Sequence, residues 1–282
     1  MNPEVLREKL RGIVQQNYEV TRAEAQHLFS DMLHHIGNPD PELRDTLIYA
    51  MLATWITRDT FTSEELKTLL KNVLDDEHLF YMIGEENTDS VFTRSFSVLL
   101  IPPILDTHRK KAFLSSDEIY HVWQKLKNYL LSEQDLCGYV RGKGWAHAVA
   151  HTADAINELA LCPETTKEML LEMLEIITRV ASTEKSVYTH GEDERLSFAV
   201  VTILKCNKLT TMEEMAWLES FRSQVQQAGP MPDPEGYQKF INIKHFLRTL
   251  YFCIVHSDLV DKVDKEERLE QIRVLLAHFG QL

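Results

Sequence analysis

The chain has 282 residues, a length that allows one large domain or two of ordinary size. Its hydrophobic content of 44% is ample for a sizeable core. Its formal net charge of −13 at pH 7 argues against nonspecific binding to nucleic acid or to an anionic membrane, because neutralising phosphate requires a basic surface.

The N-terminal residues and the cysteines indicate the cellular compartment. The first residues are charged and lack the apolar run of a signal peptide, and the longest apolar run, 96–105, is too short to span a bilayer. The four cysteines show no CxxC spacing, which is typical of small core residues in a reducing compartment. We therefore expect a cytoplasmic protein, with neither nucleic acid nor a membrane as a partner.

Residues 1–40 are predicted to form N-terminal capping helices, and residues 41–282 to form helical-pair repeats. Five apolar helical segments recur about every 49 residues, a period typical of stacked helical repeats. They begin near Asp45, Arg94, Trp145, Arg195 and Asn242.

A second set of helices is predicted from capping boxes, in which Ser or Thr is followed three residues later by Glu. The boxes are Thr21/Glu24, Thr62/Glu65, Ser115/Glu118, Thr165/Glu168 and Thr211/Glu214. From Thr62 onward these helices alternate with the apolar ones, so the repeating unit is helix, turn, helix. The prolines within 228–236 predict a rigid connector, and strand patterns are nearly absent.

These patterns together predict an all-α fold, a right-handed α–α superhelix of the HEAT or armadillo kind. We expect about eleven or twelve helices in a single α-solenoid domain that spans residues 1–282. In such a stack the apolar helices form the inner layer. Their polar first turns would then line one concave groove.

The third apolar segment carries the densest polar chemistry. On a helical wheel His147, His151, Asp154 and Glu158 fall within an arc of about 60°. Two imidazoles at i and i+4 with a carboxylate can chelate a divalent ion such as zinc, iron or manganese, which makes His147, His151 and Asp154 candidate metal ligands. The adjacent Glu of the His-Glu-x-x-His motif is absent, and we therefore expect no cofactor, with a divalent metal as the alternative.

Two other interpretations of the same residues stay open. A His–Asp pair can act as a general base, with the carboxylate fixing the tautomer. Alternatively, the polar stripe is a hydrogen-bonded network or a metal-free ligand site, with Asp154 paired to an arginine of the next repeat. Arg195 is a candidate for that arginine, and the segment 188–193 could instead complete a metal site.

The stretch 138–144 precedes this helix and is the most glycine-dense part of the chain. Glycines with Arg141 and Lys143 before a helix N-terminus could bind an anion through backbone N–H groups. The same glycines could also serve a turn that requires positive φ.

The candidate ligand-binding residues come from the first turns of the apolar helices and the loop before the third. They are Arg94, Arg141, Lys143, Trp145, His147, His151, Asp154, Arg195, Asn242 and Arg248. Cations gathered in an otherwise acidic chain suit a small polar or anionic ligand, or a peptide, in the concave groove. The alternatives are a metal-dependent hydrolase-type enzyme that uses His147, His151 and Asp154, or a protein–protein interaction scaffold, and whether the chain is an enzyme stays open.

Several stretches resemble the bacterial family catalogued as domain of unknown function 2785. They are Arg94-Ser-Phe-Ser, the Lys143-Gly-Trp-Ala-His stretch that runs to Asp154, Glu192-Asp-Glu-Arg-Leu196 and the segment 246–252. The resemblance spans most of the chain from about residue 40. It implies an arginine where Cys137 stands here, so that one potential groove cation is missing. It implies a shared site and no particular reaction.

Overall fold

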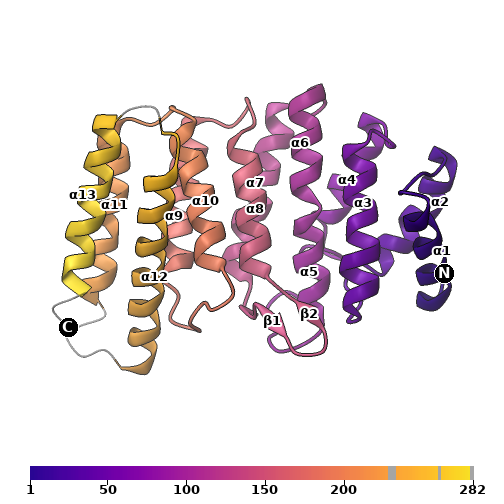
Figure 1. The fold of residues 1–282 in the computed structure, drawn as a ribbon, viewed down its shortest axis with the longest axis horizontal. Helices are drawn as coiled ribbons and strands as arrows, with labels where there is room; N and C mark the ends of the chain where they lie inside the picture. The colour runs from indigo at the N-terminus through magenta and orange to yellow at the C-terminus, as the bar shows by residue number, and fades with distance from the viewer. Residues whose placement is uncertain (228–232, 260–261, 280–282) are drawn as a thin grey trace. The chain divides into compact units, whose positions relative to one another are not determined.

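The computed structural model describes residues 1–227, 233–259 and 262–279, and these are almost entirely helical (Figure 1). Among the described residues, η1 continues directly into α3 and a single residue separates α5 from α6, which leaves twelve helical runs. The predicted all-α class is thus confirmed. Residues 228–232 of the predicted connector lie outside the described residues. Within the described ranges no helix is long and apolar enough to cross a membrane.

One compact unit comprises Met1–Glu158. Its helices are α1 (Pro3–Gln15), α2 (Arg22–His34), the π-helical η1 (Glu42–Tyr49), α3 (Ala50–Thr57), α4 (Ser63–Val73), α5 (Ser90–Leu99), α6 (Ile101–Lys111), α7 (Ser116–Ser132) and most of α8 (Ala148–Ala160). The first two helices match the predicted N-terminal pair. The core includes Trp55, Phe96 and Trp123, whose side chains are buried.

The segment η1 departs from ordinary α-helical geometry. The backbone N–H of Ala50 donates to the carbonyl of Asp45, five residues earlier. Such i→i+5 bonding is rare and is found mostly as short bulges, often at functional sites. Here it carries Arg44 and Asp45, which both lie in the site described below.

The second compact unit comprises Leu159–Leu282. Its helices are α9 (Lys167–Ala181), α10 (Glu192–Lys205), α11 (Thr211–Gln227), α12 (Pro234–His256) and α13 (Lys262–Phe279). Helices α10 and α12 pack against each other, and α11 contacts both α9 and α13 (Figure 1). Next-but-one helices are therefore neighbours within this unit, as in stacked helix pairs. The prediction of a single domain over residues 1–282 stays a prediction.

Three of the five capping boxes form as predicted, at Thr21, Thr62 and Ser115. The other two predictions were wrong by one residue. Thr166 caps α9, because the hydroxyl of Thr165 is buried and donates to the carbonyl of Leu159 at 2.6 Å.

Helix α11 is capped by Thr210 instead of Thr211. The Thr210 hydroxyl accepts from the backbone N–H of Glu213 at 3.3 Å, and the Glu213 carboxylate accepts from the Thr210 N–H at 2.8 Å. Glu214 cannot serve in the box because its buried carboxylate pairs with Arg268 on α13.

Two starts of apolar helices also differ from the prediction. Helix α12 begins at Pro234, eight residues before Asn242, because Asp233 caps it by accepting from the N–H of Gly236. Trp145 does not open a helix. It lies in a two-residue strand, β2 (Gly144–Trp145), which pairs antiparallel with β1 (Tyr139–Val140), and α8 begins at Ala148.

Candidate functional site

The loop that leads into α8 is attached to the core by a buried ion pair. Arg94 on α5 has no exposed surface and binds Glu133 at the end of α7, with Nε to Oε2 at 2.6 Å and Nη2 to Oε1 at 2.8 Å. Although burial opposes its charge, the hydrogen bonds and charge of Glu133 raise the pKa of Arg94 above its usual value. Arg94 is thus a core residue, and its predicted place in a ligand groove was wrong.

The same network orders the start of the loop. The Glu133 carboxylate accepts from the backbone N–H of Asp135 at 3.0 Å. The buried Asp135 in turn accepts from the N–H of Asn87 at 2.8 Å and of Cys137 at 3.1 Å. The residue that stands in place of the implied arginine, Cys137, therefore takes part through its backbone.

A second buried arginine, Arg44 on η1, holds the far end of the loop. Its Nη2 donates to the carbonyl of Lys143 at 2.6 Å, and its Nη1 donates to the carbonyl of Asn38 at 2.7 Å. Its guanidinium lies over the rings of Phe92 and Phe96, 4.1 and 4.7 Å from their centroids. Burial lowers the pKa of Arg44 to about 10, so the group remains charged at neutral pH.

The close approach of Arg44 requires a glycine in the loop. Gly144 has φ of +84°, and a Cβ there would lie 3.0 Å from Cβ of Pro41 and 3.3 Å from Nη2 of Arg44. The turn interpretation of the glycine-rich stretch is therefore the one that the geometry supports at this position.

Sequence reasoning missed Arg44, although a signal for it exists. Arg44 precedes Ile48 and Met51 at helical spacing, on what is otherwise an apolar face. A charged residue at a core position of a helix indicates a buried hydrogen-bonding role.

Beyond the arginine, rings from the loop and α8 form a continuous row. Trp145 stacks on His147 with ring centroids 4.4 Å apart, and His147 meets His151 edge-on at 5.5 Å. His151 in turn meets Phe96 at 5.4 Å, and Trp145 meets Tyr139 at 4.9 Å. The outer end of this row is exposed, with 41% of Trp145 accessible, while His151 is 8% exposed.

The backbone sets the position of His147. It has φ of +51°, outside the helix that follows, and its N–H donates to the carbonyl of Cys137 at 3.2 Å. His151 lies within α8, and its Nδ1 is 3.1 Å from the carbonyl of Ser95. Because a carbonyl can only accept, Nδ1 of His151 carries the hydrogen.

A carboxylate on η1 adds acid–base chemistry to this row. Burial raises the pKa of Asp45 above its usual value, and the positive charges of Arg44 and His147 act in the opposite direction. Asp45 thus lies partly buried and close enough to His147 for a charge on the imidazole to act on it. A carboxyl group and an imidazole in such surroundings are suited to hydrogen bonding and to proton exchange with a polar ligand.

The predicted metal ligands do not come together as a ligand set. Within the described ranges, no group of three or more His, Cys, Asp or Glu is placed to hold a metal ion. The physical reason is that α8 begins after His147, whose φ of +51° lies outside the regular helix that the helical wheel assumed. The ring of His147 stacks on Trp145. Asp154 is half-buried on α8.

The remaining predicted residues differ in their surroundings. Arg141 is exposed, and Lys143 pairs with Asp89, with Nζ and Oδ1 2.6 Å apart. In the second unit, Arg195 and Arg248 are exposed.

Asn242 is buried and does not line a groove. Its amide donates to the carbonyls of Thr183 and Ser186, and its Oδ1 accepts from the N–H of Tyr188 at 2.9 Å. It therefore anchors the segment between α9 and α10, and its ligand-binding role stays a prediction.

Comparison with known families shows to which family the chain belongs. A family model described as "Protein of unknown function (DUF2785)" matches residues 79–252. The chain therefore belongs to this family, and the resemblance noted from its motifs is confirmed. Searches of curated proteins and of solved structures gave no match.

Proposed function

We propose that the chain binds a small polar ligand with a planar face at the loop and helix formed by residues 139–151. The row from Trp145 through His147 to His151 carries this proposal, because it presents an exposed indole backed by half-buried His147 and buried His151. Aromatic faces of this kind bind planar groups by stacking, and nearby polar groups then fix the orientation.

The polar groups beside the row indicate which charge and which polar groups a ligand should carry. His147 and Asp45 supply hydrogen-bonding and acid–base capacity. Arg94 is buried and Lys143 pairs with Asp89, so fewer cations serve the site than the sequence predicted. A neutral or singly charged polar ligand fits this balance better than a multiply charged anion.

The rigidity of the site favours binding over a flexible scaffold role. Arg44 and Arg94 hold both ends of the loop through hydrogen bonds at 2.6–2.8 Å. A loop ordered in advance loses less conformational entropy when a ligand binds. A scaffold surface has no need of such internal fixation.

The proposal also includes the overall architecture and the cellular compartment. We expect the helix pairs to stack as a right-handed HEAT-like superhelix, as the 49-residue period and the next-but-one packing in the second unit suggest. We also place the protein in the cytoplasm of a bacterium. All four cysteines are thiols, which suits a reducing compartment.

Fluorescence quenching tests the ligand site directly. Of the four tryptophans, Trp55, Trp123 and Trp217 are buried, with at most 7% exposed, whereas Trp145 is 41% exposed. Iodide should therefore quench Trp145 selectively, and Trp145→Phe should remove most of the quenchable signal. A panel of nucleosides, saccharides and aromatic carboxylates is then screened for protection of Trp145 from iodide.

Affinity measurements on variants complete the test. For a compound that protects Trp145, we expect Trp145→Ala and His147→Ala to weaken binding about tenfold or more, as is common for central aromatic contacts. Tyr120→Ala, a change at another exposed aromatic on α7, should leave binding unchanged. A protecting compound whose affinity is the same in all three variants would refute the proposal.

A further inference from the structure

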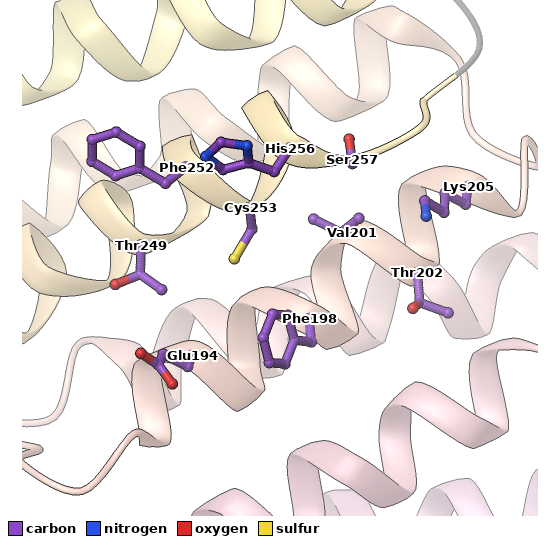
Figure 2. A pocket seen from close by; sticks show the side chains of 10 residues that line it. All are labelled: Glu194, Phe198, Val201, Thr202, Lys205, Thr249, Phe252, Cys253, His256 and Ser257. Atoms are coloured by element: carbon purple, nitrogen blue, oxygen red, sulfur yellow. The ribbon is translucent and has the colours of Figure 1, made fainter.

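The second compact unit contains a groove of about 650 Å³ between α10 and α12. Half of its lining comes from α10 and half from α12 and the residue that follows it (Figure 2). The lining includes Glu194, Phe198, Lys205, Thr249, Phe252 and Cys253.

Two exposed aromatic rings form the sides of this groove. Phe198 on α10 is 51% exposed and Phe252 on α12 is 60% exposed. In Figure 2 they lie on opposite helices, with Cys253 between them. Large apolar side chains that gather in one exposed concave patch mark binding sites more often than scattered ones do.

The charges in the groove are unequal at its two ends. Glu194 is exposed at one end, and within the described ranges its carboxylate makes no hydrogen bond or ion pair. The neighbouring Asp193 accepts from the hydroxyl of Thr249 at 2.6 Å, which joins α10 to α12 there. At the other end Lys205 forms an ion pair with Asp258, which compensates its charge.

The thiol of Cys253 lies near the same two carboxylates. Burial raises the pKa of Cys253, and the negative charges of Glu194 and Asp193 raise it further. These carboxylates lie close enough to the groove floor to act on the thiol, which stays protonated and unsuited to nucleophilic attack. A cation gains from both the carboxylate and the aromatic faces.

We infer that this groove binds a small organic ammonium ion, with its apolar body between Phe198 and Phe252 and its charged head beside Glu194. Aromatic faces attract ammonium groups through their quadrupole, and an exposed carboxylate supplies the opposite charge. The groove belongs wholly to the second unit, so this inference does not depend on the ligand proposed for residues 139–151.

Three probes of the same size separate the forces involved. Benzylammonium, benzyl alcohol and benzoate share one ring and differ in charge, and their binding to the full chain can be measured by ligand-observed NMR and calorimetry. We expect benzylammonium to bind in the millimolar to high-micromolar range, about tenfold tighter than benzyl alcohol, and benzoate to bind least.

Substitutions locate the binding within the groove. Glu194→Gln removes the charge and keeps the shape, and Phe252→Leu keeps an apolar side chain but removes the aromatic face. We expect each to weaken benzylammonium binding about fivefold. Glu175→Gln, which changes an exposed carboxylate on α9 outside the groove, serves as the matched control and should change nothing.

Each alternative result overturns the inference. Equal binding of the three probes would mean an apolar groove without charge selection, and tightest binding of benzoate would mean that Lys205 dominates. Benzylammonium binding that survives Glu194→Gln and Phe252→Leu would place the cation elsewhere. Absence of benzylammonium binding would refute the inference outright. Circular dichroism melts of the variants, all at exposed positions, confirm that folding is unchanged.

Discussion

The two buried arginines of the first unit, Arg44 and Arg94, keep their charge by different means. Arg94 has a bidentate carboxylate partner, Glu133. Arg44 relies instead on backbone carbonyls and on the faces of Phe92 and Phe96. Because a planar guanidinium can stack and donate in several directions at once, lysine cannot replace it in such a setting.

We predict that Arg44→Met destabilises the protein by about 2–4 kcal/mol, because the carbonyls of Lys143 and Asn38 lose their donors inside the core. Arg44→Lys should recover little of this loss. Urea titrations give the free energy of unfolding, and iodide quenching of Trp145 shows whether the loop has moved.

Arg58→Met is the matched control for Arg44. Arg58 is exposed and also donates to a backbone carbonyl, that of Asn17 at 2.7 Å. We expect a loss below about 0.5 kcal/mol for this change. Similar losses for Arg58→Met and Arg44→Met would mean that burial does not give Arg44 its importance.

Asp45 should make stability depend on pH. Its pKa is raised in the folded state, so folding favours the protonated acid. Its stabilising contribution is thus complete below the ordinary carboxyl pKa and is lost as pH rises through the raised value. We expect Asp45→Asn to melt at the same temperature as the wild type or a few degrees higher at pH 7, and to lose this advantage in acid.

Thermal melts between pH 3 and pH 8 measure this dependence. Asp76→Asn, at an exposed carboxylate, should melt in parallel with the wild type across the range. A lower melting temperature of Asp45→Asn at pH 7 would show that the ionised form of Asp45 stabilises the fold, contrary to the prediction.

For single residues, the sequence predicted which side chains lie close together locally, but not which of them are buried. The proximity of His147 and His151 could be predicted, because they are four residues apart in the sequence. The burial of Arg94 could not, because its partner Glu133 is 39 residues away and no local pattern joins them. The ligand-binding roles themselves stay predictions.

Among the elements, the short β1–β2 hairpin determines the geometry of the loop. It turns the chain between Val140 and Gly144 and brings Gly144 against Pro41. Gly142 and Gly144 both have positive φ, +81° and +84°, but a Cβ on Gly142 would meet nothing within 4 Å. Comparing substitutions at the two glycines therefore distinguishes the cost of positive φ from the cost of close packing.

We predict that Gly144→Ala costs about 2–4 kcal/mol and Gly142→Ala about 1 kcal/mol. Both substitutions place a side chain at positive φ, and only Gly144→Ala also forces Pro41 or Arg44 to move. Chemical denaturation of the two variants provides the comparison. Equal losses would show that the contact with Pro41 relaxes without cost.

Helix starts show where local sequence stops being decisive. Thr62 and Ser115 cap their helices as predicted because each has one suitable partner in sequence. Two adjacent threonines, Thr210 and Thr211, offer alternative caps, and the choice depends on Glu214 turning inward to Arg268, 54 residues away. Tertiary contacts thus decide what the capping pattern leaves open.

At the scale of the whole molecule, the boundary between the two compact units falls within α8, between Glu158 and Leu159. The family match, residues 79–252, includes parts of both units. The alternation of apolar and capped helices from Thr62 onward predicted the order of helices in both units, but not a division into units. Unit boundaries depend on long-range contacts, and the sequence pattern contained no signal for one inside a helix.

We predict that Arg268→Ala destabilises the second unit by about 3–5 kcal/mol, since it leaves the buried carboxylate of Glu214 without its partner. Burial already raises the pKa of Glu214 despite this partner. Hydrogen exchange with mass spectrometry should show lost protection in α11 and α13, with α3 and α5 unchanged.

The double change Arg268→Met with Glu214→Leu tests the reason for that loss. Replacing both charges by apolar side chains removes the cost of dehydrating them, and we expect most of the stability to return. Continued instability in the double variant would show that the ion pair itself, and not the orphaned charge, stabilises the helices.

The π-helical segment η1 has a consequence for the evolution of the site. A residue added to an α-helix is absorbed as a bulge, and each residue turns the helix by about 100°. Deleting one residue within Glu42–Tyr49 would restore regular winding and swing Arg44 and Asp45 away from the loop that they face. Family members one residue shorter in this helix should therefore have a differently supported site, so helix length there can sort the family into subgroups.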